Sequence, residues 1–401
     1  MYFCAMSNKR GYELEFIALM ASLMSIVALS IDALLPALPE IGNALGVVNI
    51  NDNQKMITMI FLGLGFGQLL FGPLSDSFGR KPIVYTGFAL FVFASFLCVT
   101  THSFEVMIIG RVLQGIGLAS LRTISMTMIR DTYSGDFMAK IISIVVMVFL
   151  LVPVIAPTLG QFLLKFYDWQ SIFYVNLIFG VLVILWFWKR QPETLKPKYK
   201  IKFSPLIFIS GTREFLKHKS AVAYTIVSGF ITGSFLVYLS TAQQIFEYQY
   251  NMAEEFPIIF ASLAVAIGLS TYLNSRVVVR FGMWKMAYYS LIAYVVISLL
   301  YILLFYSINP SAFVLVSFFA IQFFAIGFVF GNVRALAMQP LGHIAGIGAA
   351  LNGFISTVMS VPIANYIGSF VKDSALPLFV GFSIFGFLSL LIFMIMKIRR
   401  A

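Results

Sequence analysis

Few ionisable residues stand inside the long apolar stretches of this sequence, and those few are its candidates for chemistry. Asp32 lies in SIVALSIDALLPALPE, and Arg111 begins RVLQGIGLAS, in which Gln114 follows three residues later. A carboxyl can exchange a proton, whereas a guanidinium keeps its charge and attracts a carboxylate. Together, these residue types could take up and release a proton.

The elements that must position these residues are helices that cross a membrane. Hydrophobic residues make up 60% of the 401 residues and charged residues only 11%, too few to cover a soluble domain. Apolar runs of about 20 residues, the length of a membrane-spanning helix, recur along the chain. We predict about twelve spans, over 16–38, 56–75, 82–100, 104–128, 138–164, 169–188, 220–243, 256–276, 285–307, 311–335, 343–370 and 374–396.

A basic segment from 189 to 219, with nine Lys or Arg, separates the first six spans from the last six. We therefore predict a six-helix bundle over 1–188, a cytoplasmic linker over 189–219 and a second bundle over 220–401. If both termini are cytoplasmic, 21 of the 27 Lys and Arg flank the spans on the inner side, and only Lys55, Lys165 and Lys372 lie outside. This asymmetry predicts that orientation, and it explains the net charge of +11 without nucleic acid.

Asp32 and Arg111 are expected at similar depth in the membrane. Each lies about six or seven residues from the outer end of its span, at about 1.5 Å per residue. We predict a direct or water-bridged couple, in which burial and the neighbouring cation oppose each other in setting the protonation of Asp32. Protonation would loosen the couple and favour another arrangement of the helices. A static ion pair that only orients two helices is the alternative, and Gln114 could hold water or relay the proton.

Two further arginines end a weak repeat. GIGLASLR ends on Arg122 and GFVFGNVR ends on Arg334, 212 residues later. If the two side chains face each other, they favour an anionic substrate or a carboxylate-bearing group. The alternative is that both extend to the cytoplasmic headgroups. Asn332 adds a neutral donor and acceptor nearby.

The turn between the second and third spans reads GPLSDSFGRKP. Gly72 permits close helix contact, and Gly79 permits a backbone conformation that a Cβ would forbid. Asp76 can meet a helix N-terminus or a basic residue, and Arg80 anchors the turn in the cytoplasm. This turn resembles the signature loop of the major facilitator superfamily. The resemblance implies an all-α membrane fold of two pseudo-symmetric six-helix bundles, with Asp76 as a conformational latch.

Other segments narrow the resemblance. RVLQGIG and VPVIAPTLGQ are similar to the fourth-helix and fifth-helix motifs of drug/proton antiporters, and SIDALLPALPEI and WQSIFYVN also resemble the Bcr/CflA-type multidrug exporters of bacteria. This implies a monomer of the bacterial inner membrane that exports drugs or siderophore-like compounds, with the proton gradient as energy source and no cofactor. Pro153 and Pro157 would bend the fifth helix, either as part of a gate or as tolerated kinks.

In transporters that this chain resembles, the fifth, seventh and eleventh helices line the pathway. That implies places in the substrate cavity for Met147, Phe235, Tyr238, Gln243 and Phe354. Met and aromatic walls suit varied apolar ligands. Plain packing is the alternative for each of these residues.

The motifs argue against other classes of function. No phosphate-binding loop, metal-ligand spacing or catalytic triad occurs in a plausible context, so we expect neither an enzyme nor a metal site. Proton-coupled export is the leading hypothesis. The second is a substrate-specific carrier, including an importer, for a small organic anion, and the third is a non-transporting receptor or scaffold.

Overall fold

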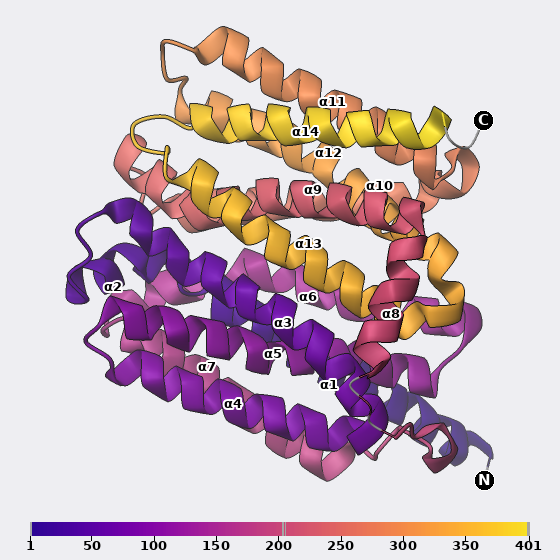
Figure 1. Cartoon of the computed structure of the whole chain (residues 1–401). Coiled ribbons are helices and arrows are strands. Elements are labelled where there is room, and N and C mark those ends of the chain that lie inside the picture. Colours follow the sequence, from indigo (N-terminus) through magenta and orange to yellow (C-terminus); the bar gives the residue numbers. More distant parts are fainter. Residues whose placement is uncertain (1, 203, 205, 399–401) are drawn as a thin grey trace.

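The computed structural model describes residues 2–202, 204 and 206–398, which fold into helices arranged in two layers (Figure 1). The first bundle contains α1 (Tyr2–Asp32), η1 (Leu35–Ala37), α2 (Leu38–Ala44), η2 (Ile50–Gln54), α3 (Lys55–Phe78), α4 (Arg80–Thr100), α5 (Phe104–Thr132), α6 (Gly135–Leu164) and α7 (Gln170–Arg190). The linker contains η3 (Pro197–Tyr199) and α8 (Leu206–Lys217). The second bundle contains α9 (Lys219–Gln244), the π-helical turn η4 (Ile245–Gln249), α10 (Phe256–Phe281), α11 (Met283–Phe305), α12 (Ala312–Met338), η5 (Gln339–Ile344), α13 (Ala345–Gly368) and α14 (Leu376–Ile398).

The predicted number of spans is confirmed. Within the described residues, 12 helices are long and apolar enough to cross a membrane. Each predicted apolar run coincides with one of these helices. Arg399 and Arg400, which the charge asymmetry includes, lie outside the described residues, as do the side chains of Lys9, Arg10 and Lys140.

The two ends of the molecule differ. Both chain ends and α8 lie at one end, which we call the linker end, and α2 lies at the opposite end, which we call the far end (Figure 1). The first bundle occupies the lower layer of Figure 1, and the second bundle occupies the upper layer. The two layers meet where α3 packs against α13 and where α6 packs against α10.

The first span is interrupted directly after Asp32, where a continuous helix was predicted over 16–38. Helix α1 ends at Asp32, and a short 3-10 turn leads into α2. Pro36 has no N–H to donate to the carbonyl of Asp32, four residues earlier, and Pro39 cannot donate to Leu35. The two prolines explain the interruption, which leaves Asp32 at a helix end inside the protein.

Helices α3 and α5 touch through their backbones. A Cβ on Gly63 would overlap the carbonyl oxygen of Val112, and a Cβ on Gly115 would overlap the carbonyl oxygen of Ile60. Only glycine permits this approach on both sides. The contact holds Arg111, on α5, directly against the first turn of α3.

A polar network joins the two bundles at the far end. Gln54 donates to the side-chain oxygen of Gln244 (2.8 Å) and to the carbonyl of Gly368 (3.3 Å). Asn51 donates to the carbonyl of Ser369, and Gln244 donates back to the side-chain oxygen of Asn51. Among the described residues, every side-chain hydrogen bond between the bundles lies near this end, including Thr58 to Asn365 and Gln161 to the carbonyl of Ala253. The far end is therefore closed in this conformation.

Candidate functional site

Asp32 is a buried carboxyl at the interruption of the first span. Asp32 is only 5% exposed. Within the described part of the chain, no hydrogen-bond donor or cation contacts its carboxylate. A carboxylate in this position would have its charge uncompensated, whereas a protonated carboxyl would carry no charge. The arrangement makes Asp32 sensitive to whether a proton is bound.

Arg111 is almost completely buried, at 1% exposure, and its donors are already engaged. Its Nε donates to the carbonyl of Met56 at 2.7 Å, and its Nη2 donates to the carbonyl of Ser30 at 3.0 Å. Of the two predicted forms of the couple with Asp32, the direct ion pair does not occur in this conformation, and the water-bridged form stays a prediction. The close α3–α5 contact brings the Met56 carbonyl against the guanidinium, which is held by backbone oxygens of α1 and α3 instead. Arg111 thus contacts the segment that ends at Asp32, but not its carboxylate.

Gln114 lies next to Arg111, as their spacing on one helix predicts. The Nη1 of Arg111 donates to Oε1 of Gln114 at 2.8 Å, and Nε2 of Gln114 donates to Oγ of Ser95 on α4 at 2.7 Å. Asn176 on α7 donates to the Ser30 hydroxyl at 2.5 Å. These contacts link four helices of the first bundle around Arg111. The predicted proton-relay role of Gln114 stays a prediction.

Arg122 on α5 and Arg334 on α12 approach each other from the two bundles, nearer the linker end. They are close enough for the charge of Arg334 to act on Arg122. The guanidinium of Arg122 lies 5.9 Å from the ring centroid of Phe149, and that of Arg334 lies 5.8 Å from that of Phe330. Neither arginine has an acidic partner among the described residues. Arg122 is half-buried and Arg334 is exposed, so both border space that a solvent molecule can enter.

Aromatic rings fill the centre of the second bundle. Tyr238 on α9 is 2% exposed, and its ring lies 4.5 Å from that of Phe323, 5.0 Å from that of Phe319 and 6.2 Å from that of Phe260. Its hydroxyl is buried without a hydrogen-bond partner among the described residues. Phe235, one turn away, is half-buried and borders the same group of rings. Tyr238 therefore lies inside the cluster and Phe235 lies at its edge.

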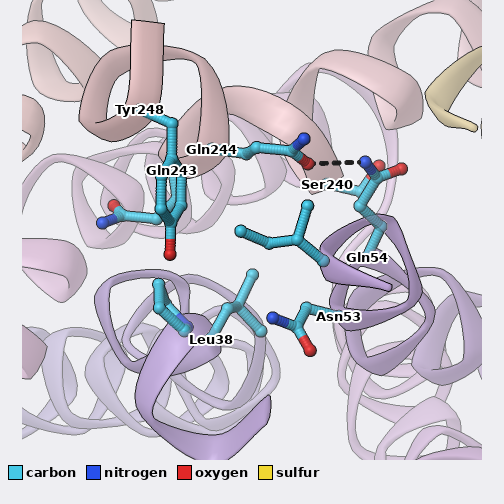
Figure 2. A pocket seen from close by; sticks show the side chains of 9 residues that line it. Leu38, Asn53, Gln54, Ser240, Gln243, Gln244 and Tyr248 are labelled. Carbon is cyan, nitrogen blue, oxygen red and sulfur yellow. Dashed lines mark hydrogen bonds between the residues drawn. The ribbon is translucent and has the colours of Figure 1, made fainter. Parts of the chain in front are cut away.

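Gln243 lies at the far end, away from the two arginines. Its side chain donates to Glu247 at 2.6 Å. It lines a small pocket between the bundles together with Leu38, Asn53 and Gln244 (Figure 2). Figure 2 also shows the hydrogen bond that joins Gln244 to Gln54 across this interface. Gln243 thus belongs to the closure of the far end in this conformation.

Three other predicted cavity residues have contacts of a different kind. Asn332 donates to the side-chain oxygen of Asn274 on α10 and to the carbonyl of Phe328, both at 2.8 Å. Phe354 packs edge-on against Phe66, which is 42% exposed, where α13 meets α3. Met147 on α6 is 58% exposed. The structure therefore does not bring these three side chains together with Tyr238.

The turn between α3 and α4 is held by ionic contacts at the linker end. Gly79 has a φ of +110°, as predicted. Arg80 donates to Asp76 at 2.5 Å and to Asp131 on α5 at 2.9 Å. The expectation for Gly72 is wrong, because a Cβ there would meet no atom within 4 Å. Arg80 therefore lies between two carboxylates, and the role of this turn as a conformational latch stays a prediction.

The linker also contacts this turn, which the sequence did not predict. Glu193 accepts hydrogen bonds from the backbone N–H groups of Arg80 and Lys81, at 3.1 and 3.0 Å. It therefore caps the first turn of α4, where a negative charge is stabilised by the helix dipole. Thr194 donates to Asp131 at 3.0 Å. In the sequence, Glu193 and Thr194 follow the basic end of α7, and that position is only a weak sign of their contact with the turn.

Pro153 and Pro157 lie inside α6, which continues past both of them to Leu164. At Gly160 this helix lies very close to the first span. A Cβ on Gly160 would overlap the carbonyl oxygen of Ala33, the residue after Asp32. Helix α6 also packs against α10 of the second bundle. It thus connects the interruption in the first span to the other bundle. The role of the prolines in gating stays a prediction.

Known proteins share this sequence pattern and this architecture. A family model described as Major Facilitator Superfamily matches residues 20–364. The uncharacterized MFS-type transporter YdgK of Bacillus subtilis is 28% identical over 90% of each chain. The bicyclomycin resistance protein homolog of Haemophilus influenzae is 27% identical over 92% of this chain and 93% of its own. The crystal structure of the human organic anion transporter MFSD10 has a TM-score of 0.69 at 17% identity, over 95% of this chain and 99% of that one, which shows a shared fold.

Proposed function

The chain belongs to the major facilitator superfamily, and from that premise we propose that it exports small organic molecules from bacteria in exchange for protons. Members of this superfamily are carriers and not enzymes, in agreement with the prediction. The family match and the bicyclomycin-resistance relative also confirm the predicted resemblance to drug exporters of the Bcr/CflA type. The substrate, the direction of transport and the coupling ion are parts of our proposal.

The observation that carries the proposal is the unpartnered carboxyl of Asp32. It lies where α1 ends, next to the segment that Arg111 holds through Ser30. Loss of the proton would create an uncompensated charge in this place. A rearrangement that brings water or a cation to Asp32 would then be favoured. In this way the protonation of one residue can bias the choice between two arrangements of the bundles.

The proposed direction of transport, out of the cell, is described relative to the predicted orientation. We assign the linker end to the cytoplasm, because basic residues flank the spans at that end. The far-end network of Asn51, Gln54 and Gln244 is then the closed outer gate. A substrate would enter from the cytoplasm, and opening of this network would release it outside. The host membrane would be the bacterial inner membrane, since the relatives are bacterial and the energy source is the proton gradient.

A substrate-specific carrier for a small organic anion remains the second candidate, favoured by Arg122 and Arg334. The two candidates differ in direction and in response to pH. An exporter loads from the linker end and moves protons the opposite way, whereas an importer loads from the far end. Both use the same alternating-access fold.

The experiment is transport by the purified protein in liposomes, with bicyclomycin as the probe and an imposed pH gradient. We expect probe movement toward the acidic compartment, accompanied by proton movement in the opposite direction. Asp32→Asn should abolish the proton movement, whereas Asp168→Asn, the same change in an exposed loop, is the control and should behave as wild type. Transport that is indifferent to the pH gradient would rule out the proposed antiport.

A further inference from the structure

Arg122 and Arg334 are two cations without a counter-ion. One comes from each bundle, and their charges act on one another. Like charges near one another on partly buried side chains repel more strongly than in bulk water. Most charges in such places are paired. The fold therefore keeps an unfavourable arrangement that an anion between the two bundles would relieve.

The contacts of the two side chains argue against simple extension to the headgroups. Each guanidinium lies over a phenylalanine ring, Phe149 for Arg122 and Phe330 for Arg334. Arg334 is also near enough for its charge to act on Arg122.

The hydrogen-bond donors of both arginines are unused. Within the described residues, neither guanidinium donates to a side-chain or backbone oxygen. In Arg111, by comparison, three nitrogens donate to three oxygens. A guanidinium presents donors in a planar fork that matches a carboxylate, sulfonate or phosphate group. The free donors of Arg122 and Arg334 have the geometry and charge to bind such a group.

An apolar surface continues from Arg334 into the second bundle. Phe330 contacts Arg334 on one side, and its ring lies 5.9 Å from that of Phe235 at an interplanar angle of 90°. Both phenylalanines are half-buried, so part of each ring is uncovered. Beyond Phe235 lie the rings of Tyr238 and Phe323. A ligand held by the arginines would have its remaining atoms beside aromatic rings.

We propose that Arg122 and Arg334 together bind the anionic group of an amphiphilic organic substrate whose apolar or aromatic part lies against Phe235 and Phe330. This rests on the proposed function and adds the chemical class of its substrate. Because each bundle supplies one arginine, a bound anion removes the repulsion between them. The bundles can then approach at the linker end, as alternating access requires.

The test is equilibrium binding to the purified protein in lipid nanodiscs, at one pH and without a gradient. The probes are 1-naphthoate, 1-naphthylmethanol and 1-naphthylmethylamine, which share a ring system and differ in charge. We expect 1-naphthoate to bind at least about tenfold more tightly than the alcohol, and the amine to bind most weakly. Arg122→Gln and Arg334→Gln should each weaken 1-naphthoate binding about tenfold and leave the alcohol unchanged.

Arg276→Gln is the matched control. Arg276 is exposed on α10, and its guanidinium also lies over a ring, that of Tyr272. This variant should bind 1-naphthoate as wild type does. If the two site variants do not fold, the thermal shift of the wild-type protein decides. Its Tm should rise with 1-naphthoate, because a ligand stabilises the state that it binds, and not with an equal concentration of the alcohol.

One further variant separates failure of this inference from failure of the proposed antiport. Asp32→Asn should retain 1-naphthoate binding, since Asp32 is not part of the anion site. Anion binding without proton-coupled transport would uphold this inference and refute antiport. Equal binding of 1-naphthoate and the alcohol by the wild-type protein would overturn the inference, as would unchanged 1-naphthoate binding in folded Arg122→Gln and Arg334→Gln variants.

Discussion

The two bundles are built on one plan but bury different chemistry. In the first bundle, Gln114 on α5 donates to Ser95 on α4, and in the second, Gln322 on α12 donates to Ser298 on α11, at 2.7 and 2.8 Å. Only the first bundle adds a buried guanidinium, Arg111, beside this bridge. The difference is a buried ionic group beside the bridge of the first bundle and a neutral bridge in the second.

The second bundle has aromatic rings where the first has charge. The rings of Phe319, Phe323 and Phe379 stack or tilt against one another, with Tyr238 among them. Neutral rings have no state that changes with a proton near neutral pH. We infer that the first bundle responds to protons and that the second presents an apolar surface to substrates.

The turns at the linker end also differ between the bundles, in whether they contain ion pairs. Gly79 precedes α4 with a φ of +110°, and Gly282 precedes α11 with a φ of +83°. Next to Gly79, Arg80 is paired with two carboxylates. The residue after Gly282 is Met283, which is uncharged, and the described residues of that turn form no ion pair. The backbone turn is repeated, but among the described residues these ion pairs occur at the first turn and not at the second.

The comparison is tested most strongly by removing each buried bridge. Arg111→Leu should destabilise the protein by about 3–5 kcal/mol, because it removes three charge-assisted hydrogen bonds, to the carbonyls of Met56 and Ser30 and to Gln114. Gln322→Leu should cost about 1–3 kcal/mol, since it removes only neutral hydrogen bonds to Ser298 and Tyr294. Denaturant unfolding of both variants in the same detergent measures the difference. Equal losses would mean that the ionic character of the first bundle has no structural consequence.

The latch gives the next largest effect. Arg80→Gln should cost about 2–3 kcal/mol, because Arg80 is buried and its partner carboxylates lose their cation. It should also slow transport more than it weakens substrate binding, since the latch lies away from the site. Arg280→Gln, in the corresponding turn of the second bundle, is the control. A similar slowing of transport in both variants would contradict the asymmetry between the turns.

Closure of the far end should respond to Gln54→Ala. This change removes hydrogen bonds to Gln244 and Gly368, worth about 1 kcal/mol each. We expect a shift of up to about thirtyfold toward conformations open at the far end. Labelling of a cysteine introduced at Ser240, which lines the far-end pocket, would report the shift. Unchanged labelling would show that the amide network is not a gate.

The smallest effect is expected for Tyr238→Phe. The Tyr238 hydroxyl is buried without a partner among the described residues, so its removal should leave stability unchanged or raise it by about 1 kcal/mol. Thermal unfolding measures this change. A loss of stability would mean that the hydroxyl has a role in the empty protein, and a loss of substrate affinity alone would place it in the binding surface.

Much of the fold was predictable because a membrane span is a local property of the sequence. Apolar length located the spans, and helical spacing placed Gln114 beside Arg111. The partners of Arg111 were not predictable, because backbone carbonyls, such as those of Met56 and Ser30, are present at every residue. The interruption after Asp32 had a signal in Pro36 and Pro39 that the prediction of a continuous helix overlooked.

The central claim is that protonation of Asp32 couples transport to the proton gradient. Asp32→Asn keeps the shape of the side chain but cannot lose a proton. We expect this variant to fold, to exchange labelled substrate across liposomes at equal concentration, and to give no substrate-dependent proton movement. Full coupling in a folded Asp32→Asn protein would contradict the claim.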